Sequence, residues 1–99
     1  MNLLAIYSTP ENEESFLDNY FNGHLPLIKK IPGLLGVDAQ KLTRTLVGEK
    51  APFMVVTMRF ADKDAAKIAL NSPEMSAAGE NLDGFARGMY TLSFSENKE

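Results

Sequence analysis

Two strand-forming segments of this chain carry apolar side chains on both faces, and this feature limits the possible folds more than any other. In residues 2–8 and 53–60, large apolar side chains occupy odd and even positions alike. Because successive side chains of a strand point to opposite faces, a sheet built from these strands must be covered on both sides. The helical segments of one chain suffice for one side. We therefore expect a homodimer joined through its sheets, with a space lined by apolar and hydroxyl groups between them.

The other elements are predicted from turn residues and helical spacing. A helix is expected after Pro10, because acidic residues there suit the positive end of a helix, and Gly23 with Pro26 predicts that this helix is interrupted. The order Ser72-Pro73-Glu74 is typical of a helix start. The predicted elements are a strand at 2–8, the interrupted helix, strands at 35–47 and 53–60, a helical region from 61 that restarts at 72, and a strand at 87–95.

This β-α-β-β-α-β order predicts an α+β, ferredoxin-like fold with a four-stranded antiparallel sheet. Right-handed crossovers place both helical regions on the same face of the sheet. The chain has no linker, repeat or low-complexity segment, and its 99 residues are the length of one domain. Residues 1–99 are therefore expected to form a single domain, and two copies are expected to form a dimeric α/β barrel.

Composition excludes several functional classes. The chain has no cysteine and one histidine, so it lacks thiolate chemistry and the ligands of a cysteine or multi-histidine metal site, and we predict no metal and no cofactor. Its net charge of −3 argues against nucleic acid or an anionic membrane as a partner. No apolar run is long enough to span a bilayer, and no basic stretch before Leu3 suggests a signal peptide, so a cytoplasmic location is expected.

Several short motifs occur together along the chain. The most specific combine aromatic residues, the histidine and a Pro-Gly pair, in the runs 20–27 (Tyr-Phe-Asn-Gly-His-Leu-Pro-Leu) and 30–34 (Lys-Ile-Pro-Gly-Leu). With residues 7–10, 60–62, 72–74 and 85–86, these runs resemble the EthD family of dimeric α/β-barrel proteins, and the resemblance covers nearly the whole chain. It implies a ferredoxin-like domain whose sheets pair in a homodimer.

The resemblance is less informative about activity. The family takes its name from a component of ether-degradation gene clusters whose own reaction is unsettled. Wider relatives of the barrel include cofactor-free isomerases, polyketide cyclases, decarboxylases and quinol-type monooxygenases. The resemblance therefore implies architecture more strongly than reaction, because one fold can host many chemistries.

His24 is the side chain best suited to acid/base chemistry, because it alone has an ordinary pKa near neutrality. Beside a helix interruption it could point away from the helix axis and reach the open end of the barrel. A structural role is the alternative. Pro26 leaves the carbonyl of Asn22 without its helical donor, and a ring N–H of His24 could satisfy that carbonyl and hold a kink. Both interpretations remain open.

Tyr7 and Tyr20 are the next catalytic candidates. A phenol can donate a hydrogen bond to a carbonyl or enolate oxygen and so stabilise the charge that develops there. Tyr20 precedes His24 by four residues and shares its helix face. Ordinary packing of half-buried tyrosines is the alternative for both residues.

Three strand residues, Thr57, Arg59 and Tyr90, are the candidates for ligand contact. Arg59 alternates with Thr57 along the third strand and could bind a carboxylate inside the barrel. An arginine at the end of a strand is also commonly solvated or paired with an acidic side chain. Tyr90 lies on the more apolar side of the last strand.

Two functions of different classes are open. In the first, the protein is a cofactor-independent enzyme: an apolar carbonyl or enol compound enters the barrel, His24 moves a proton, and Tyr7 or Tyr20 stabilises the oxyanion, giving isomerisation, cyclisation or decarboxylation. In the second, a noncatalytic dimer binds a small hydrophobic molecule as an accessory to an oxidative catabolic pathway. Haem or quinol oxidation is disfavoured, because the chain has no tryptophan and one histidine.

Overall fold

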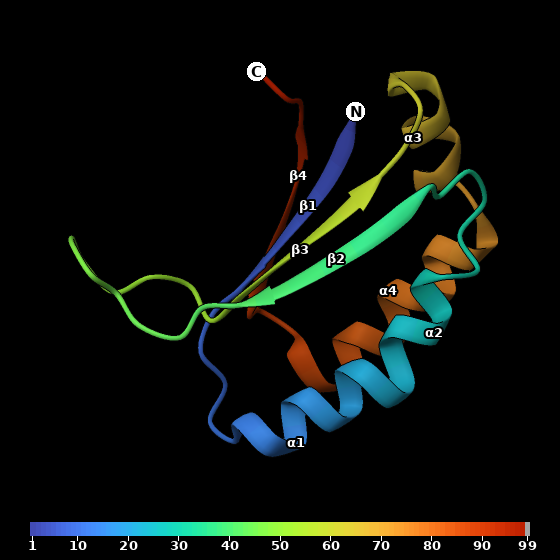
Figure 1. Ribbon diagram of the computed structural model, residues 1–99. Coiled ribbons are helices and arrows are strands. Elements are labelled where there is room, and N and C mark those ends of the chain that lie inside the picture. The colour runs from blue at the N-terminus through green and yellow to red at the C-terminus, as the bar shows by residue number, and fades with distance from the viewer. Residues whose placement is uncertain (99) are drawn as a thin grey trace.

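The computed structural model describes residues 1–98. Its elements follow the predicted order, as Figure 1 shows. They are β1 (Asn2–Tyr7), α1 (Glu13–Asp18), a π-helical segment η1 (Asn19–His24), α2 (Leu25–Ile28), β2 (Gly36–Lys41), β3 (Met54–Arg59), α3 (Lys63–Leu70), α4 (Pro73–Ala86) and β4 (Tyr90–Ser95).

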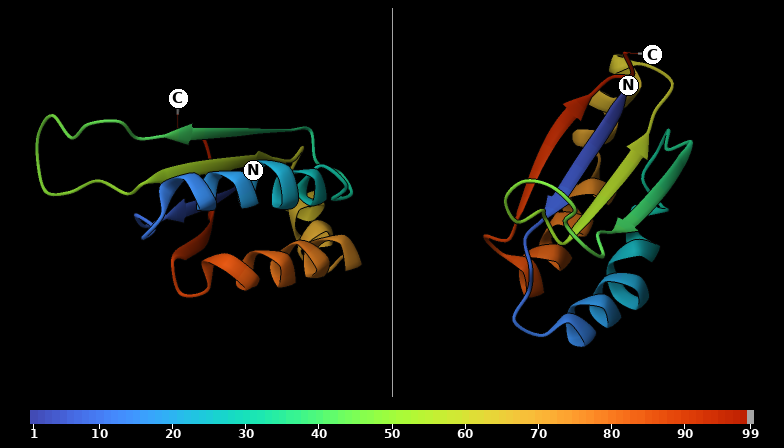
Figure 2. Two further views of the ribbon diagram at one scale, coloured as in Figure 1. Left: turned by 90° about the horizontal axis from the view of Figure 1, so that it is seen from below. Right: turned by 60° about the vertical axis from the view of Figure 1, so that its left-hand side comes forward.

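The four strands form one antiparallel sheet in the order β2-β3-β1-β4. β1 is central because it pairs with β3 on one side and β4 on the other. The helices lie together on one face of this sheet, and the opposite face is uncovered (Figure 2). The prediction of an α+β, ferredoxin-like fold is therefore confirmed.

The strand register decides which residues face the helices. Tyr7 on β1 lies opposite Met54 on β3 and Tyr90 on β4, so these three side chains share a face. On β1 the residues Leu3, Ala5 and Tyr7 are buried, whereas the residues between them are only half-buried. The odd-numbered side chains of β1 therefore belong to the core between sheet and helices.

The uncovered face of the sheet is less apolar than the sequence predicts. Its large apolar side chains are Leu4 and Ile6 on β1 and Val55 on β3, all half-buried. The outer strands contribute polar side chains to the same face, namely Asp38, Gln40, Thr91 and Ser93. Apolar character on both faces is thus confined to the two central strands, and the uncovered face is an apolar stripe with polar borders.

The second strand is shorter than predicted. The sequence predicts a strand at 35–47, but β2 ends at Lys41, because Lys41 lies opposite Met54, the first residue of β3. Residues 42–53 form a loop that projects beyond the sheet (Figure 1). Within it, Leu46 and Val47 are 77% and 92% exposed, since their side chains reach no core.

The helical region after β3 is divided as predicted. α3 ends at Leu70 and α4 begins at Pro73, where the Ser72 hydroxyl accepts a hydrogen bond of 3.1 Å from the backbone N–H of Met75. A serine cap followed by proline favours a new helix at this point. None of the helices in residues 1–98 is long and apolar enough to cross a membrane.

Candidate functional site

Four side chains of the first helical region are buried at intervals of four residues: Phe16, Tyr20, His24 and Ile28. In a regular α-helix of about 3.6 residues per turn, each such step drifts by about 40°, so the first and last would point about 120° apart. The π-helical segment removes this drift. In it, the Leu25 N–H bonds to the Tyr20 carbonyl five residues earlier, and the wider turn keeps all four side chains on the core side.

The interruption predicted at Gly23 and Pro26 does not break the helix, since α1, η1 and α2 follow one another without a gap. Proline cannot donate to the carbonyl four residues earlier, and its ring crowds that carbonyl. A local change to the wider π-helical turn relieves this conflict. Such turns are rare in proteins, and those that occur are often at functional sites. This one ends at His24.

His24 is 4% exposed and is held by contacts from two helices. Its Nδ1 lies 3.2 Å from Oδ1 of Asn81 on α4, and its ring centroid lies 5.0 Å from that of Tyr20. The hydrogen bond goes to Asn81, and not to the Asn22 carbonyl that a kink-holding role would require. Burial lowers the pKa of His24, and the bond to Asn81 opposes part of that effect. The imidazole is therefore neutral at pH 7.

The second ring nitrogen of His24 is available to a ligand. With Asn81 accepting through Oδ1, Nδ1 carries the proton and Nε2 keeps its lone pair. Within residues 1–98, every side-chain nitrogen or oxygen atom that packing closes off from solvent has a hydrogen-bond partner. Because Nε2 bonds to no other protein group there, it is not sealed by packing, and His24 lines a cavity. A neutral imidazole in this state is a proton acceptor.

Tyr7 and Tyr20 lie together beside His24. The Tyr7 hydroxyl donates to the Tyr20 hydroxyl over 3.4 Å, and their rings meet edge to face with centroids 5.4 Å apart. Burial raises the pKa of Tyr20 to about 12. It raises the pKa of Tyr7 further, because the Tyr20 phenol adds to the effect. Both phenols therefore stay protonated and can act only as neutral hydroxyl groups.

A cavity of about 70 Å³ lies between the helix layer and the sheet. Among residues 1–98, no charged side chain lines it, and its polar groups come from His24, Tyr7 and Tyr90. Tyr20 is packed behind them and does not line it. The lining residues are Ala5, Tyr7, His24, Ile28, Ile31, Met58, Met75, Ala78, Gly79, Leu82, Tyr90 and Leu92.

The structure separates the sequence-predicted site residues into two groups. Tyr90 joins His24 on the helix side of the sheet, where its ring lies 5.9 Å from that of Tyr7. Thr57 and Arg59 lie on the uncovered face, because β3 alternates and its buried residues are the even-numbered ones. His24 therefore lies on the opposite side of the sheet from the uncovered face, and not in the space that the paired uncovered faces of a dimer would enclose.

Arg59 forms an ion pair with Asp38 on the neighbouring strand. The guanidinium lies over Gly36, where an added Cβ would collide with it. Both partners are substantially exposed, so the pair is screened by solvent. Of the two roles considered for Arg59, the structure shows the pairing with an acidic side chain.

Sequence reasoning did not identify Asn81 and Asp83. Asn81 is 57 residues from His24, and Asp83 accepts a hydrogen bond of 3.0 Å from the Tyr90 hydroxyl. An asparagine and an aspartate on a helix carry no motif, so only the packing of α4 against the first helical region shows their role. In the described residues, no group of three histidine or acidic side chains could hold a metal ion.

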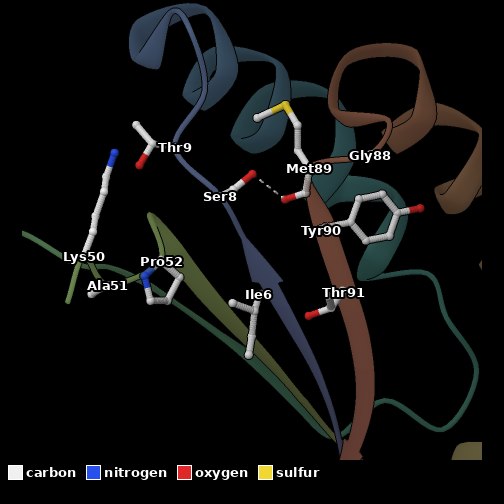
Figure 3. A pocket seen from close by; sticks show the side chains of 10 residues that line it. All are labelled: Ile6, Ser8, Thr9, Lys50, Ala51, Pro52, Gly88, Met89, Tyr90 and Thr91. Atoms are coloured by element: carbon white, nitrogen blue, oxygen red, sulfur yellow. Dashed lines mark hydrogen bonds between the residues drawn. The ribbon is translucent and has the colours of Figure 1, made fainter. Parts of the chain in front are cut away.

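A second hollow lies at the end of β1 and the start of β4 (Figure 3), and it shares Tyr90 with the smaller cavity. It is wider, at about 540 Å³, and is lined by the loops at residues 8–9 and 50–52 together with Ile6 and residues 88–91. Lys50 is its one charged side chain, and Ser8 is engaged with the Met89 carbonyl at 3.1 Å. His24, Tyr7 and Tyr20 are not part of it, so the acid/base groups belong to the smaller cavity.

Comparisons with known proteins complete the description of the site. No family model matches the chain. A solved structure of an EthD family protein from Bacillus halodurans C-125 is 31% identical, covers 97% of this chain and 96% of its own, and superposes with a TM-score of 0.91. This chain belongs to the EthD family. The resemblance inferred from the motifs is thereby confirmed.

This EthD family member is also similar to an uncharacterized 11.0 kDa protein from the thcB-thcC intergenic region of Rhodococcus erythropolis, at 26% identity over 93 residues, which are 94% of this chain and 90% of that protein. Two more distant structures share the fold. A dimeric ferredoxin-like protein from Jannaschia sp. CCS1 is 17% identical with a TM-score of 0.72 and 97% coverage of both chains. SnoaB, a cofactor-independent oxygenase from Streptomyces nogalater, is 14% identical with a TM-score of 0.65, covering 98% of this chain and 93% of its own.

Proposed function

We propose that this EthD family protein is a cofactor-independent acid/base enzyme acting on a small apolar carbonyl or enol compound in the cavity between helices and sheet. One observation carries the proposal: a neutral histidine, whose Nε2 bonds to no protein group within residues 1–98, lines a cavity whose other walls are apolar side chains and phenols. A neutral base beside phenol donors suits proton transfer at carbon, because the imidazole accepts the proton and a phenol stabilises the oxyanion that develops.

The proposed chemistry assigns one step to each group. His24 accepts a proton at Nε2 from the carbon next to the substrate carbonyl, and the electron pair of that C–H bond moves to form an enolate. The Tyr7 hydroxyl donates a hydrogen bond to the enolate oxygen. For this, the single hydroxyl proton of Tyr7 turns from Tyr20 to the substrate, and the Tyr20 hydroxyl, 3.4 Å away, then donates to the Tyr7 oxygen and so positions that phenol. Return of the proton from His24 to a different carbon completes an isomerisation, and general acid–base catalysis of this type contributes about 10² to 10⁴-fold.

The size of the cavity limits the substrate. An apolar protein cavity of about 150 Å³ holds benzene, and this one measures about 70 Å³. A six-membered ring therefore requires side chains of the lining to move. Met58 and Met75 are suited to this, because their unbranched chains change rotamer easily. We expect ligand binding to widen the cavity at these two residues.

A noncatalytic binding protein is the second candidate. The lining offers few polar groups and holds apolar side chains from both layers, as expected for a site that retains a small hydrophobic molecule without converting it. In this function His24 would serve only as a hydrogen-bond acceptor for the ligand. SnoaB, which shares the fold and works without a cofactor, supports the enzymatic proposal by analogy of fold alone.

We also infer that the protein is a homodimer in which the uncovered faces of two sheets meet. The half-buried stripe of Leu4, Ile6 and Val55 supports this arrangement, as does the dimeric state of the ferredoxin-like protein from Jannaschia sp. CCS1. Light scattering at micromolar concentration is expected to give twice the 10.9 kDa of one chain. A monomeric mass would contradict the inference.

The enzymatic proposal is tested by proton exchange. Enolisable ketones are first screened by thermal shift, because any ligand of the folded state raises the melting temperature. Those that bind are then incubated with protein in D2O, and the loss of the α-proton signal is followed by NMR. Wild type is expected to exchange the proton, and His24→Ala to lose exchange by about 10²-fold or more while retaining the thermal shift.

Lys29→Ala is the matched control, because Lys29 follows α2 in the same helical region and is exposed. It should leave exchange unchanged. Equal exchange in wild type and His24→Ala would remove the catalytic role of His24 and leave the binding function as the better explanation. Absence of any thermal shift across the panel would remove both functions.

A further inference from the structure

The lining residues of the cavity beside His24 are exposed on one side only. Its lining residues on β1, α2 and β3 are buried, including Ala5, Ile28 and Met58. The lining residues with partial exposure all belong to α4 or β4, and they are Met75, Gly79, Tyr90 and Leu92. Leu92 is 44% exposed although it also contacts the cavity. The cavity therefore communicates with the surface between α4 and β4.

The two sides of this opening differ in how much space their side chains take. On α4, Met75, Gly79 and Asp83 are spaced four residues apart and so lie along one side of the helix. The Tyr90 hydroxyl donates a hydrogen bond of 3.0 Å to Asp83, which joins β4 to α4 at one end of this row. At Gly79, in the middle, there is no side chain, and a Cβ built there would meet no other atom within 4 Å.

We propose that the opening between α4 and β4 is the entrance to the His24 cavity, that Gly79 keeps it open, and that it admits an uncharged apolar molecule. The ligand class follows from the walls: none of the lining side chains is charged, so a charged ligand would lose its hydration without gaining a partner. This inference rests on the proposed function only in assuming that the cavity takes a ligand, and it does not depend on catalysis.

A matched pair of glycine substitutions on α4 tests the entrance. Gly79→Leu places a branched side chain in the opening. Gly84→Leu adds the same side chain to the same helix at a glycine that also has no atom within 4 Å of its Cβ and that does not line the cavity. Because neither position has positive φ, both variants are expected to fold.

The probes are xenon, acetophenone and benzoate, followed through NMR chemical shifts of Ala78 and Leu82 in the buried wall. Wild type and Gly84→Leu are expected to bind xenon and acetophenone at equal rates, and Gly79→Leu to slow the entry of both at least tenfold, as read from exchange broadening of these signals. Benzoate, an anion of similar shape to acetophenone, is expected to give no shift at these residues. Leu92→Trp narrows the opening from the strand side and is expected to slow entry in the same way.

Three outcomes would overturn the inference. Unchanged entry rates in both Gly79→Leu and Leu92→Trp would place the entrance elsewhere while leaving a ligand cavity, and hence the proposed function, intact. Binding of benzoate as tight as that of acetophenone would remove the ligand class. Absence of xenon shifts in wild type would remove the ligand cavity itself, and with it both the entrance and the proposed function. Failure of the proton-exchange assay alone would refute catalysis and leave the entrance standing.

Discussion

The buried, neutral state of His24 predicts that the protein loses stability as the pH falls from 7.5 to 5.5. Burial lowers the pKa of His24 in the folded protein, whereas in the unfolded chain it is about 6.5. Below that value the unfolded state binds a proton that the folded state resists, so stability falls as the pH is lowered towards the pKa of the folded state. At pH 7.5 neither state is appreciably protonated and the effect is absent.

The size of this loss has an upper limit. If the folded protein binds no proton at pH 5.5, the unfolded state is favoured by about elevenfold, or about 1.4 kcal/mol. For a chain of this length the corresponding fall in melting temperature is about 6 to 11 °C. His24→Gln, which cannot titrate but keeps a polar side chain within reach of Asn81, removes this contribution and retains those of all carboxylates.

The assay is urea unfolding of wild type and His24→Gln at both pH values, with the difference between the two losses as the result. Wild type is expected to lose up to about 1.4 kcal/mol more than His24→Gln. Equal losses in the two proteins would refute the reasoning, because they would mean that His24 titrates in the folded protein as it does in the unfolded chain. NMR titration of the imidazole independently checks whether the pKa of His24 is lowered in the folded protein.

Three further predictions concern contacts around the site. Asn81→Ala leaves the His24 Nδ1–H without its partner at 3.2 Å, so we expect the free energy of unfolding, measured in urea, to fall by about 1 to 3 kcal/mol. The same variant should lower the His24 pKa still further in an NMR titration. An unchanged pKa would show that this bond does not hold the ring. Gly84→Ala, where a Cβ meets no neighbour, should raise stability by about 0.5 to 1 kcal/mol in the same assay, and a loss would indicate a contact that the structure lacks. Arg59→Ala breaks an ion pair that is exposed within one chain, beside the polar border of the face joined in the inferred dimer, and should cost less than about 1 kcal/mol; a larger loss at high salt would show that the dimer interface buries the pair.

The predictable parts of the fold depend on contacts between near neighbours in the sequence. The Ser72 cap reaches only three residues ahead, to Met75, and the cap at Asp62 likewise reaches Ala65. Such pairings are visible in the residue order. The end of β2 at Lys41 could not be predicted in this way, because strand-forming residues continue beyond it and only the start of β3 determines where pairing stops.

His24, Tyr7 and Tyr90 could be selected from the sequence because their chemistry is carried by the residue type. Their surroundings could not, since the π-helical register and the bond to Asn81 depend on how α4 packs against the first helical region. Alternation along β3 correctly placed Thr57 and Arg59 on one face, but the residue order is the same whichever face the helices cover.

The amino-acid order alone therefore determined the element sequence, the ferredoxin-like class and the scarcity of catalytic groups, because these follow from local propensity, period and composition. Tertiary packing alone decided that His24, Tyr7 and Tyr90 share a cavity on the helix side of the sheet. It also decided that Thr57 and Arg59 lie on the other side. The physical reason is that burial is a property of the assembled layers: a side chain becomes a neutral base or a surface ion only when the elements around it exclude or admit water.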